Sequence, residues 1–162
     1  MNSWIPMTSD QYRLAWDKMY KDFKFKPSIH SSDWPSFRLP SPFVTYDVTE
    51  YTDEDIDDLE EKCISCLRAI TVPEEYIYAL DWQHQCYLYY PHRERGNVGA
   101  RIGFYPDGDY CFFLQKDFKW GYLGHPWEHS ISLFGETLIH QFEADRPTIF
   151  GKLVRSRSCH AS

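Results

Sequence analysis

The fold class is decided by residues 52–90, which read TDEDIDDLEEKCISCLRAITVPEEYIYALDWQHQCYLYY. In the first part, apolar side chains recur at helical spacing and lie within about 100° on a helical wheel. They are Ile56, Leu59, Cys63, Cys66, Leu67 and Ile70. Thr52 is a typical N-cap for this helix, and the acids after it suit the positive end of the helix dipole. The second part holds two strand-like runs, residues 76–80 and 86–90, with no helix between them.

Two further helices are predicted on either side of this stretch. Thr8 and Gln11 form a capping-box pair, and an apolar stripe with helical spacing follows from Tyr12 to Phe23. The other helix begins at Gly135 and stops before Pro147.

The order of these elements predicts the α+β class. Residues 43–48 and 148–154 favour two more strands, so the order is helix, strand, helix, a run of strands, helix and a last strand. We expect one globular domain over residues 1–162, with an antiparallel-rich mixed sheet and about three helices packed mainly on one face. Residues 155–162 are predicted to form a frayed tail.

A β-hairpin is predicted around Pro106-Asp107-Gly108, because residues 100–105 and 109–114 are apolar runs on either side of these turn-forming residues. Gly108 is free to adopt a positive φ in such a turn.

Composition limits the classes of function. The chain has 24 acidic residues against 17 Lys and Arg, a net charge of −7, which opposes nucleic-acid binding. One interpretation of this charge is solubility alone, and the other is faster association with a basic protein partner. No secretory signal and no apolar run of membrane-spanning length occur, so no membrane partner is expected. Five cysteines in a chain of this size suggest reduced thiols and a cytoplasmic setting.

The familiar catalytic and cofactor motifs do not occur. The Cys63 and Cys66 pair matches C-x-x-C but lies on the apolar stripe of its helix, so we expect buried core thiols. His125 and His129 are spaced like zinc ligands, but Pro126 disfavours the helix that would bring them together. No phosphate-binding glycine pattern and no nucleophile elbow is present. We therefore expect no metal and no cofactor.

Two aromatic stretches carry the candidate site. Residues 80–85 join two strands with large polar and aromatic groups, and residues 119–128 combine two glycines with two Trp and one Tyr. One interpretation is an ordered loop whose Trp rings cover the sheet edge. The other is a binding site formed by Trp82, His84, Trp120, His125, Trp127 and Glu128.

These stretches also carry a family resemblance. Residues 80–84 (LDWQH), 105–110 (YPDGDY) and 124–128 (GHPWE) resemble the motifs of an uncharacterised bacterial family, over roughly Tyr12 to Phe150. Its members are single-domain proteins of this size, known as a domain of unknown function, from soil Gram-positive genomes. The resemblance implies a bacterial, cytosolic setting and supplies no reaction, cofactor or catalytic residue.

Three hypotheses from different classes remain open on the sequence, the third being a housekeeping structural or oligomerising module. The net charge, the acidic helix from Asp53 to Glu61 and the lack of a catalytic signature favour a protein-binding domain of the immunity or antitoxin type. The alternative is a small enzyme or ligand-binding domain, with His84, His125 and Glu128 as acid–base groups between Trp walls. The sequence indicates no oligomeric state.

Overall fold

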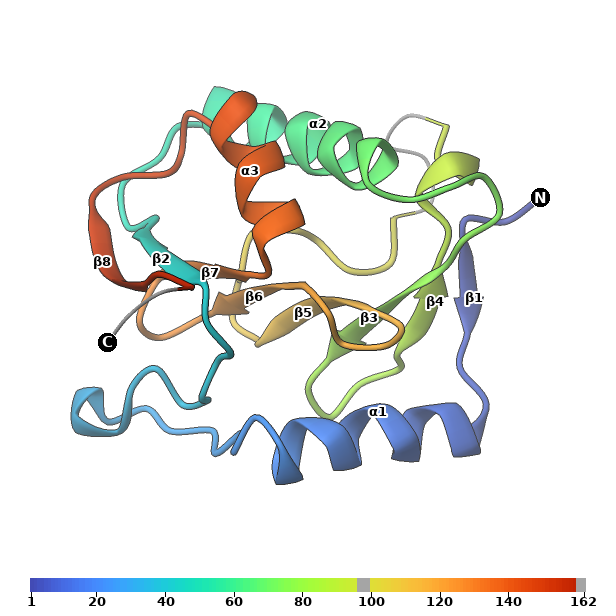
Figure 1. Ribbon diagram of the computed structural model, residues 1–162, viewed down its shortest axis with the longest axis horizontal. Helices are drawn as coiled ribbons and strands as arrows, with labels where there is room; N and C mark the ends of the chain where they lie inside the picture. Colours follow the sequence, from blue (N-terminus) through green and yellow to red (C-terminus); the bar gives the residue numbers. More distant parts are fainter. Residues whose placement is uncertain (96–99, 160–162) are drawn as a thin grey trace.

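The computed structural model describes residues 1–95 and 100–159, which form three α-helices and eight strands (Figure 1). The helices are α1 (Ser9–Lys21), α2 (Asp53–Ala69) and α3 (Glu136–Ala144). The strands are β1 (Trp4–Pro6), β2 (Phe43–Asp47), β3 (Ile77–Asp81), β4 (Tyr87–Tyr89), β5 (Cys111–Gln115), β6 (Gly121–His125), β7 (Ser130–Phe134) and β8 (Leu153–Arg157). Short 3-10 helices occupy Ser31–Asp33 and Pro91–Arg93. Within the described ranges, no helix is long and apolar enough to cross a membrane.

The strands form a single sheet in the order β1-β4-β3-β5-β6-β7-β2-β8. Each pairing between neighbouring strands is antiparallel. The predicted α+β class is confirmed, and the sheet is antiparallel throughout. β1 was not predicted, because a three-residue edge strand leaves no recognisable pattern in the sequence.

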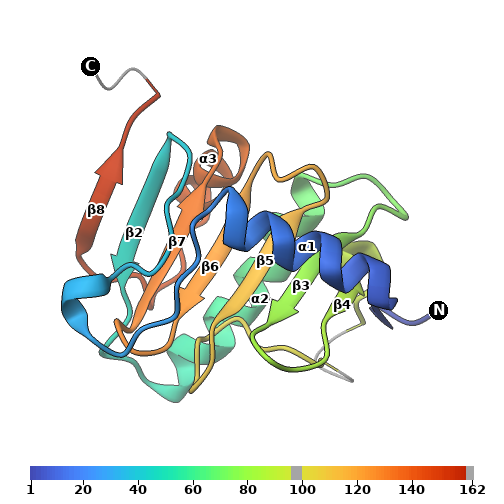
Figure 2. The same cartoon turned by 90° about the horizontal axis from the view of Figure 1, so that it is seen from below.

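The sheet separates two layers (Figure 1). Two of the three helices, α2 and α3, cover one face, and α1 lies across the other face over β6, β5, β3 and β4 (Figure 2). Residues 27–42 continue from α1 over the part of that face formed by β7, β2 and β8 (Figure 2). Because successive side chains of a strand point to opposite faces, each strand contributes to both apolar cores.

Local sequence signals account for the starts of α1 and α2. The Thr8 hydroxyl accepts a hydrogen bond from the Gln11 backbone N–H, and the Thr8 backbone N–H donates to the Gln11 side chain. Thr52 and Asp55 form the same reciprocal pair at the start of α2. Both predicted N-caps are confirmed, and each satisfies backbone donors that a helix start leaves free.

The predicted hairpin around residues 106–108 is wrong. Residues 100–105 form no strand, and β5 pairs instead with β3 and β6. The Phe104 ring stacks on Phe113 at 4.4 Å between ring centroids, and its carbonyl accepts a hydrogen bond from the Tyr122 hydroxyl at 2.7 Å. The apolar run therefore covers the sheet as an irregular segment. Gly108 does adopt a positive φ, +82°, in the turn that precedes β5.

The predicted frayed tail begins too early. β8 extends to Arg157 and pairs with β2, with Thr45 opposite Arg155 and Phe43 opposite Arg157. The free edge of β2 offers backbone donors and acceptors, so a polar segment can form a strand there without an apolar pattern of its own. Residues 160–162 of the predicted tail lie outside the described part of the chain.

Candidate functional site

Three of the predicted site residues meet around the ring of Tyr110. The ring centroid of Tyr110 lies 4.8 Å from His125, 5.5 Å from Trp127 and 6.0 Å from Trp82. His125 ends β6, Trp127 lies in the β6–β7 turn, and Trp82 follows β3. Tyr110 precedes β5 and is fully buried. We call these four residues the Tyr110 cluster.

His125 is fully buried in this cluster and has hydrogen-bond partners at both ring nitrogens. Its Nδ1 accepts from the backbone N–H groups of Trp127 at 3.3 Å and Glu128 at 3.0 Å. The Nε2 atom lies 2.9 Å from the hydroxyl of Ser36, which also accepts from the Tyr110 hydroxyl at 3.1 Å. Because Nδ1 accepts, Nε2 carries the proton of the neutral ring and donates it to Ser36.

This arrangement opposes a role for Ser36 and His125 as a nucleophile and base. A general base must present a lone pair to the hydroxyl that it deprotonates, and here His125 presents a donor. Burial also lowers the pKa of His125 to about 4, so the ring is neutral near pH 7. The contacts instead anchor residues 27–42 to the end of β6.

Glu128 lies in the same turn and is paired with β8. Its carboxylate accepts from both terminal nitrogens of Arg155, at 2.8 and 2.6 Å, and from the Ser130 hydroxyl at 2.6 Å. Burial alone would raise the pKa of Glu128, but the hydrogen bonds from Arg155 and Ser130 outweigh it and the pKa is lowered. Glu128 is therefore a charged anchor between the β6–β7 turn and β8.

The two other predicted residues lie outside the Tyr110 cluster. Trp120 is buried in the core beneath α2 and α3, on the other face of the sheet. His84 is exposed in the β3–β4 turn, with its Nδ1 atom 3.3 Å from Asp81 and 3.7 Å from Asp109. Asp81 raises the pKa of His84 by its negative charge and its hydrogen bond. The side chains of Asp81, His84 and Asp109 could hold a metal ion, since their donor atoms lie within 4.8 Å of one another.

The segment around residues 119–128 is not the ordered loop of the first interpretation, because residues 121–125 form β6. Gly121 and Gly124 belong to β6 in the middle of the sheet. A Cβ atom at Gly121 would lie 2.5 Å from both Leu114 and Phe134, and one at Gly124 would lie 2.6 Å from the Cys111 sulfur. The glycines therefore provide space for neighbouring side chains, and the sheet itself positions Trp120 and His125 on different faces.

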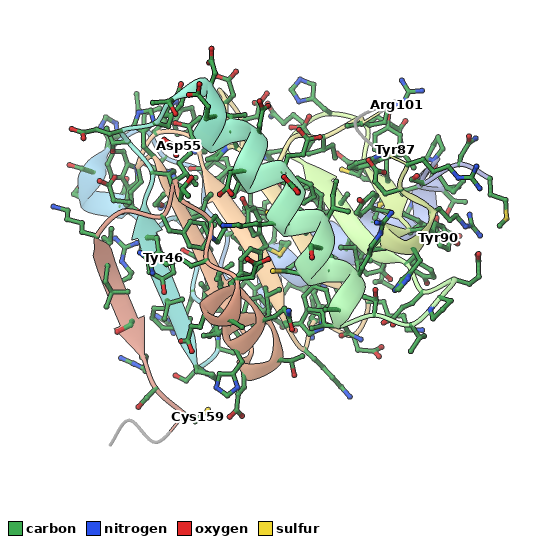
Figure 3. All side chains as sticks on the ribbon, turned by 90° about the horizontal axis from the view of Figure 1, so that it is seen from above. Tyr46, Asp55, Tyr87, Tyr90, Arg101 and Cys159 are labelled. Atoms are coloured by element: carbon green, nitrogen blue, oxygen red, sulfur yellow. The ribbon has the colours of Figure 1, made fainter. Side chains whose placement is uncertain are left out.

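The predicted acidic helix is α2, whose outer surface faces the viewer in Figure 3. We call its four exposed acids, Asp53, Glu54, Asp57 and Glu61, the α2 acidic stripe. Within residues 1–95 and 100–159, none of the four forms an ion pair. Two other acids of α2 have structural roles, because Asp55 and Asp58 both accept hydrogen bonds from Thr148.

The CxxC cysteines are buried in the core, as predicted. Cys63 and Cys66 are unpaired thiols on the inner side of α2. Burial raises the pKa of both thiols, that of Cys66 to about 11, so neither is a reactive thiolate near neutral pH.

Sequence reasoning missed three residues of this region: Ser36, Tyr110 and Arg155. Ser36 lies in a proline-rich segment in which no sequence pattern singles it out. In the structure its φ is +75°, an unusual backbone conformation for a residue other than glycine. Arg155 was assigned to the tail. A signal existed only for Tyr110, which lies in the YPDGDY motif at residues 105–110.

These features define a class of protein: a single α+β domain with an eight-stranded antiparallel sheet between helical layers. The chain belongs to the family described as "Protein of unknown function (DUF2716)", whose model matches residues 6–139. It is 30% identical to the uncharacterized protein YxiI of Bacillus subtilis (strain 168), over 93% of this chain and 98% of that protein. The expected membership of an uncharacterised bacterial family is thereby confirmed. No solved structure matches the chain.

Proposed function

We propose that this domain binds a basic partner protein through the α2 acidic stripe, in the manner of an immunity or antitoxin protein. The observation that carries the proposal is the stripe itself, four exposed acids on one helix that form no ion pair within the described ranges. Glu54, Asp57 and Glu61 follow one another at spacings of three and four residues, so their side chains share one side of the helix.

The stripe is not needed to hold the helix on the sheet. The opposite side of α2 carries the buried residues Leu59, Cys63, Cys66 and Leu67. Asp53 and Glu54 lie in the first turn, where their charge suits the helix dipole, but Asp57 and Glu61 lie beyond it and their like charges repel one another across one turn. Such a surface is useful when a cationic partner neutralises it, because complementary charge speeds encounter and selects the partner.

The Tyr110 cluster does not favour the alternative of an acid–base enzyme. His125 is buried and presents a proton to Ser36, while Glu128 is held by Arg155. His125 has no free lone pair on its ring, and the Glu128 carboxylate is largely buried between Arg155 and Ser130, so neither offers the accessible lone pair that a general base needs.

We also propose a cytoplasmic setting for this binding. Its support is chemical: the five cysteines are unpaired thiols, and a reducing compartment keeps such thiols free.

The test compares charge reversal on the stripe with a matched change elsewhere. The D57K/E61K variant reverses two stripe charges, and D17K/D117K makes the same change in net charge at two exposed acids of α1 and the β5–β6 turn. A basic protein that co-purifies with the tagged wild-type domain is purified, and its Kd is measured by titration calorimetry for all three proteins.

We expect the Kd to rise about 10- to 100-fold for D57K/E61K at low salt and to change little for D17K/D117K. Added salt should weaken the wild-type complex, because exposed charges are screened. Equal losses in both variants, or a wild-type domain that retains no basic protein, would refute the proposal.

A further inference from the structure

A pocket lies on the sheet face opposite α2, where β2, β7 and β8 meet the segment 35–39. Its volume is about 490 Å³, within the range of small-molecule sites. Three arginines line it, Arg38, Arg155 and Arg157, and the lining contains no acidic residue. In a chain of net charge −7, this is a local concentration of positive charge.

The register of β2 with β7 and β8 determines which side chains line the pocket. In the antiparallel pairing of β2 with β8, Phe43 lies opposite Arg157 and Thr45 opposite Arg155, and Thr45 also lies opposite Ser132 of β7. Residues that lie opposite one another in a sheet point to the same face. The two arginines of β8 therefore stand beside Phe43 and Thr45, on the face that residues 27–42 cover (Figure 2).

The three arginines differ in whether their guanidinium groups are already paired with an acid. Arg155 already holds Glu128 through two hydrogen bonds, which fixes its guanidinium at the side of the pocket. Arg38 and Arg157 are exposed, and within residues 1–95 and 100–159 neither forms an ion pair. Planar guanidinium groups bind the oxygens of phosphate and carboxylate in a bidentate fashion, so Arg38 and Arg157 provide two free anion-binding groups.

The remaining lining is mainly apolar. Phe37, Leu39 and Phe43 form part of the wall. Thr45 and Ser132 form the floor, but both are fully buried and their hydroxyls are hydrogen-bonded to each other at 2.7 Å. The two hydroxyls therefore already have a hydrogen-bond partner, and a bound molecule would contact the arginines and the apolar side chains of the lining.

We infer that this pocket binds a small organic anion, whose phosphate or carboxylate group contacts Arg38 and Arg157 and whose apolar part packs on Phe37, Leu39 and Phe43. The site lies on the face opposite the α2 acidic stripe and uses none of its residues. It is therefore independent of the proposed protein binding.

The inference is tested with three probes on the full chain: phenyl phosphate, benzoate and inorganic phosphate. Kd values are measured by titration calorimetry for the wild type, Arg38→Gln, Arg157→Gln and Leu39→Ala. Arg101→Gln is the matched control, because Arg101 is also exposed, makes the same change in charge and lies across the molecule from β8 (Figure 3). Circular dichroism melts establish that each variant is folded.

We expect phenyl phosphate or benzoate to bind, and the better of the two identifies the anionic group. Its Kd should rise about tenfold or more in Arg38→Gln and in Arg157→Gln, because each loses a charge-assisted hydrogen bond, and should not change in Arg101→Gln. Leu39→Ala should weaken phenyl phosphate or benzoate but leave inorganic phosphate unchanged.

Three results would overturn the inference. The first is that neither organic probe binds the wild type. The second is that Arg101→Gln weakens binding as much as the pocket variants, which would indicate general charge attraction. The third is that inorganic phosphate binds as tightly as phenyl phosphate, which would remove the apolar part of the site. Loss of the basic protein partner in D57K/E61K would leave all of these probe measurements unaffected.

Discussion

The two faces of the sheet are made by alternate residues of the same strands, yet they carry different chemistry. On β7, Ile131 and Leu133 point into the apolar core beneath α2 and α3, whereas Ser130 and Ser132 point to the other face. That other face is apolar beneath α1, whereas beneath residues 27–42 it also carries the polar groups of His125, Glu128 and the arginine pocket.

The difference shows what each kind of cover permits. A helix satisfies its own backbone hydrogen bonds and presents a side-chain stripe, so it packs best on an apolar surface. The irregular segment brings Ser36 as a partner for the buried His125. A buried imidazole needs such a partner, and here the irregular segment supplies it.

The largest expected effect is a difference in the free energy of unfolding between two adjacent positions of β7 that point to opposite faces of the sheet. Leu133→Ala removes a fully buried side chain beneath α3 and should lower the free energy of unfolding by about 2–5 kcal/mol. Ser132→Ala, on the other face, leaves the Thr45 hydroxyl without its partner and should cost about 1–3 kcal/mol. Urea unfolding followed by fluorescence measures both. Equal costs would mean that the two faces do not differ in packing.

A second effect concerns pH and belongs to the polar face alone. The pKa of His125 is about 4 in the folded chain and about 6.5 when unfolded, so the unfolded state binds the proton more readily between these values. Stability from the neutral ring is fully present above about pH 6.5 and is lost as the pH falls towards 4, to a total of about 3 kcal/mol.

The control for this effect is His125→Asn, which removes the titrating group. Unfolding free energies at pH 7, 6, 5 and 4 should fall more steeply for the wild type than for this variant. The carboxylates titrate in both proteins, so the difference in slope isolates His125. Parallel curves would show that the ring is not held neutral.

A third, intermediate effect tests the anchor between the β6–β7 turn and β8. Arg155→Met should lower the free energy of unfolding by about 1–3 kcal/mol, because the largely buried Glu128 loses its charged partner. A double-mutant cycle with Glu128→Gln measures the coupling of the pair. Additive losses would contradict the anchor.

The smallest effect is expected on the outer surface of α2. Replacing Glu54, Asp57 and Glu61 with Gln, Asn and Gln should change the unfolding free energy by less than about 0.5 kcal/mol each, as for other exposed positions. Thr52→Ala is the contrasting change on the same helix and should cost about 1 kcal/mol through loss of the cap. Thermal melts compare the two. A large loss of unfolding free energy in the acid replacements would show that the α2 acidic stripe stabilises the fold.

Much of the candidate site could be predicted, but not its chemistry. Trp82, His125 and Trp127 do meet, because a buried strand end and two turns bring their aromatic rings around Tyr110. Trp120 does not join them, because its side chain lies in the core on the opposite face of the sheet, and only the tertiary structure decides which face that is. The role of His125 depends on Ser36, which no local pattern associates with it.

The sequence by itself determined the helix starts, the buried side of α2, the net negative charge and the α+β class. These depend on caps, periodicity and composition, which involve residues within a few turns of one another. Only the tertiary structure decided the strand order, the tautomer of His125 and the presence of the arginine pocket. Each of these needs contacts between distant parts of the chain, such as Phe43 with Arg157 and Ser36 with His125, and a local pattern cannot specify such partners.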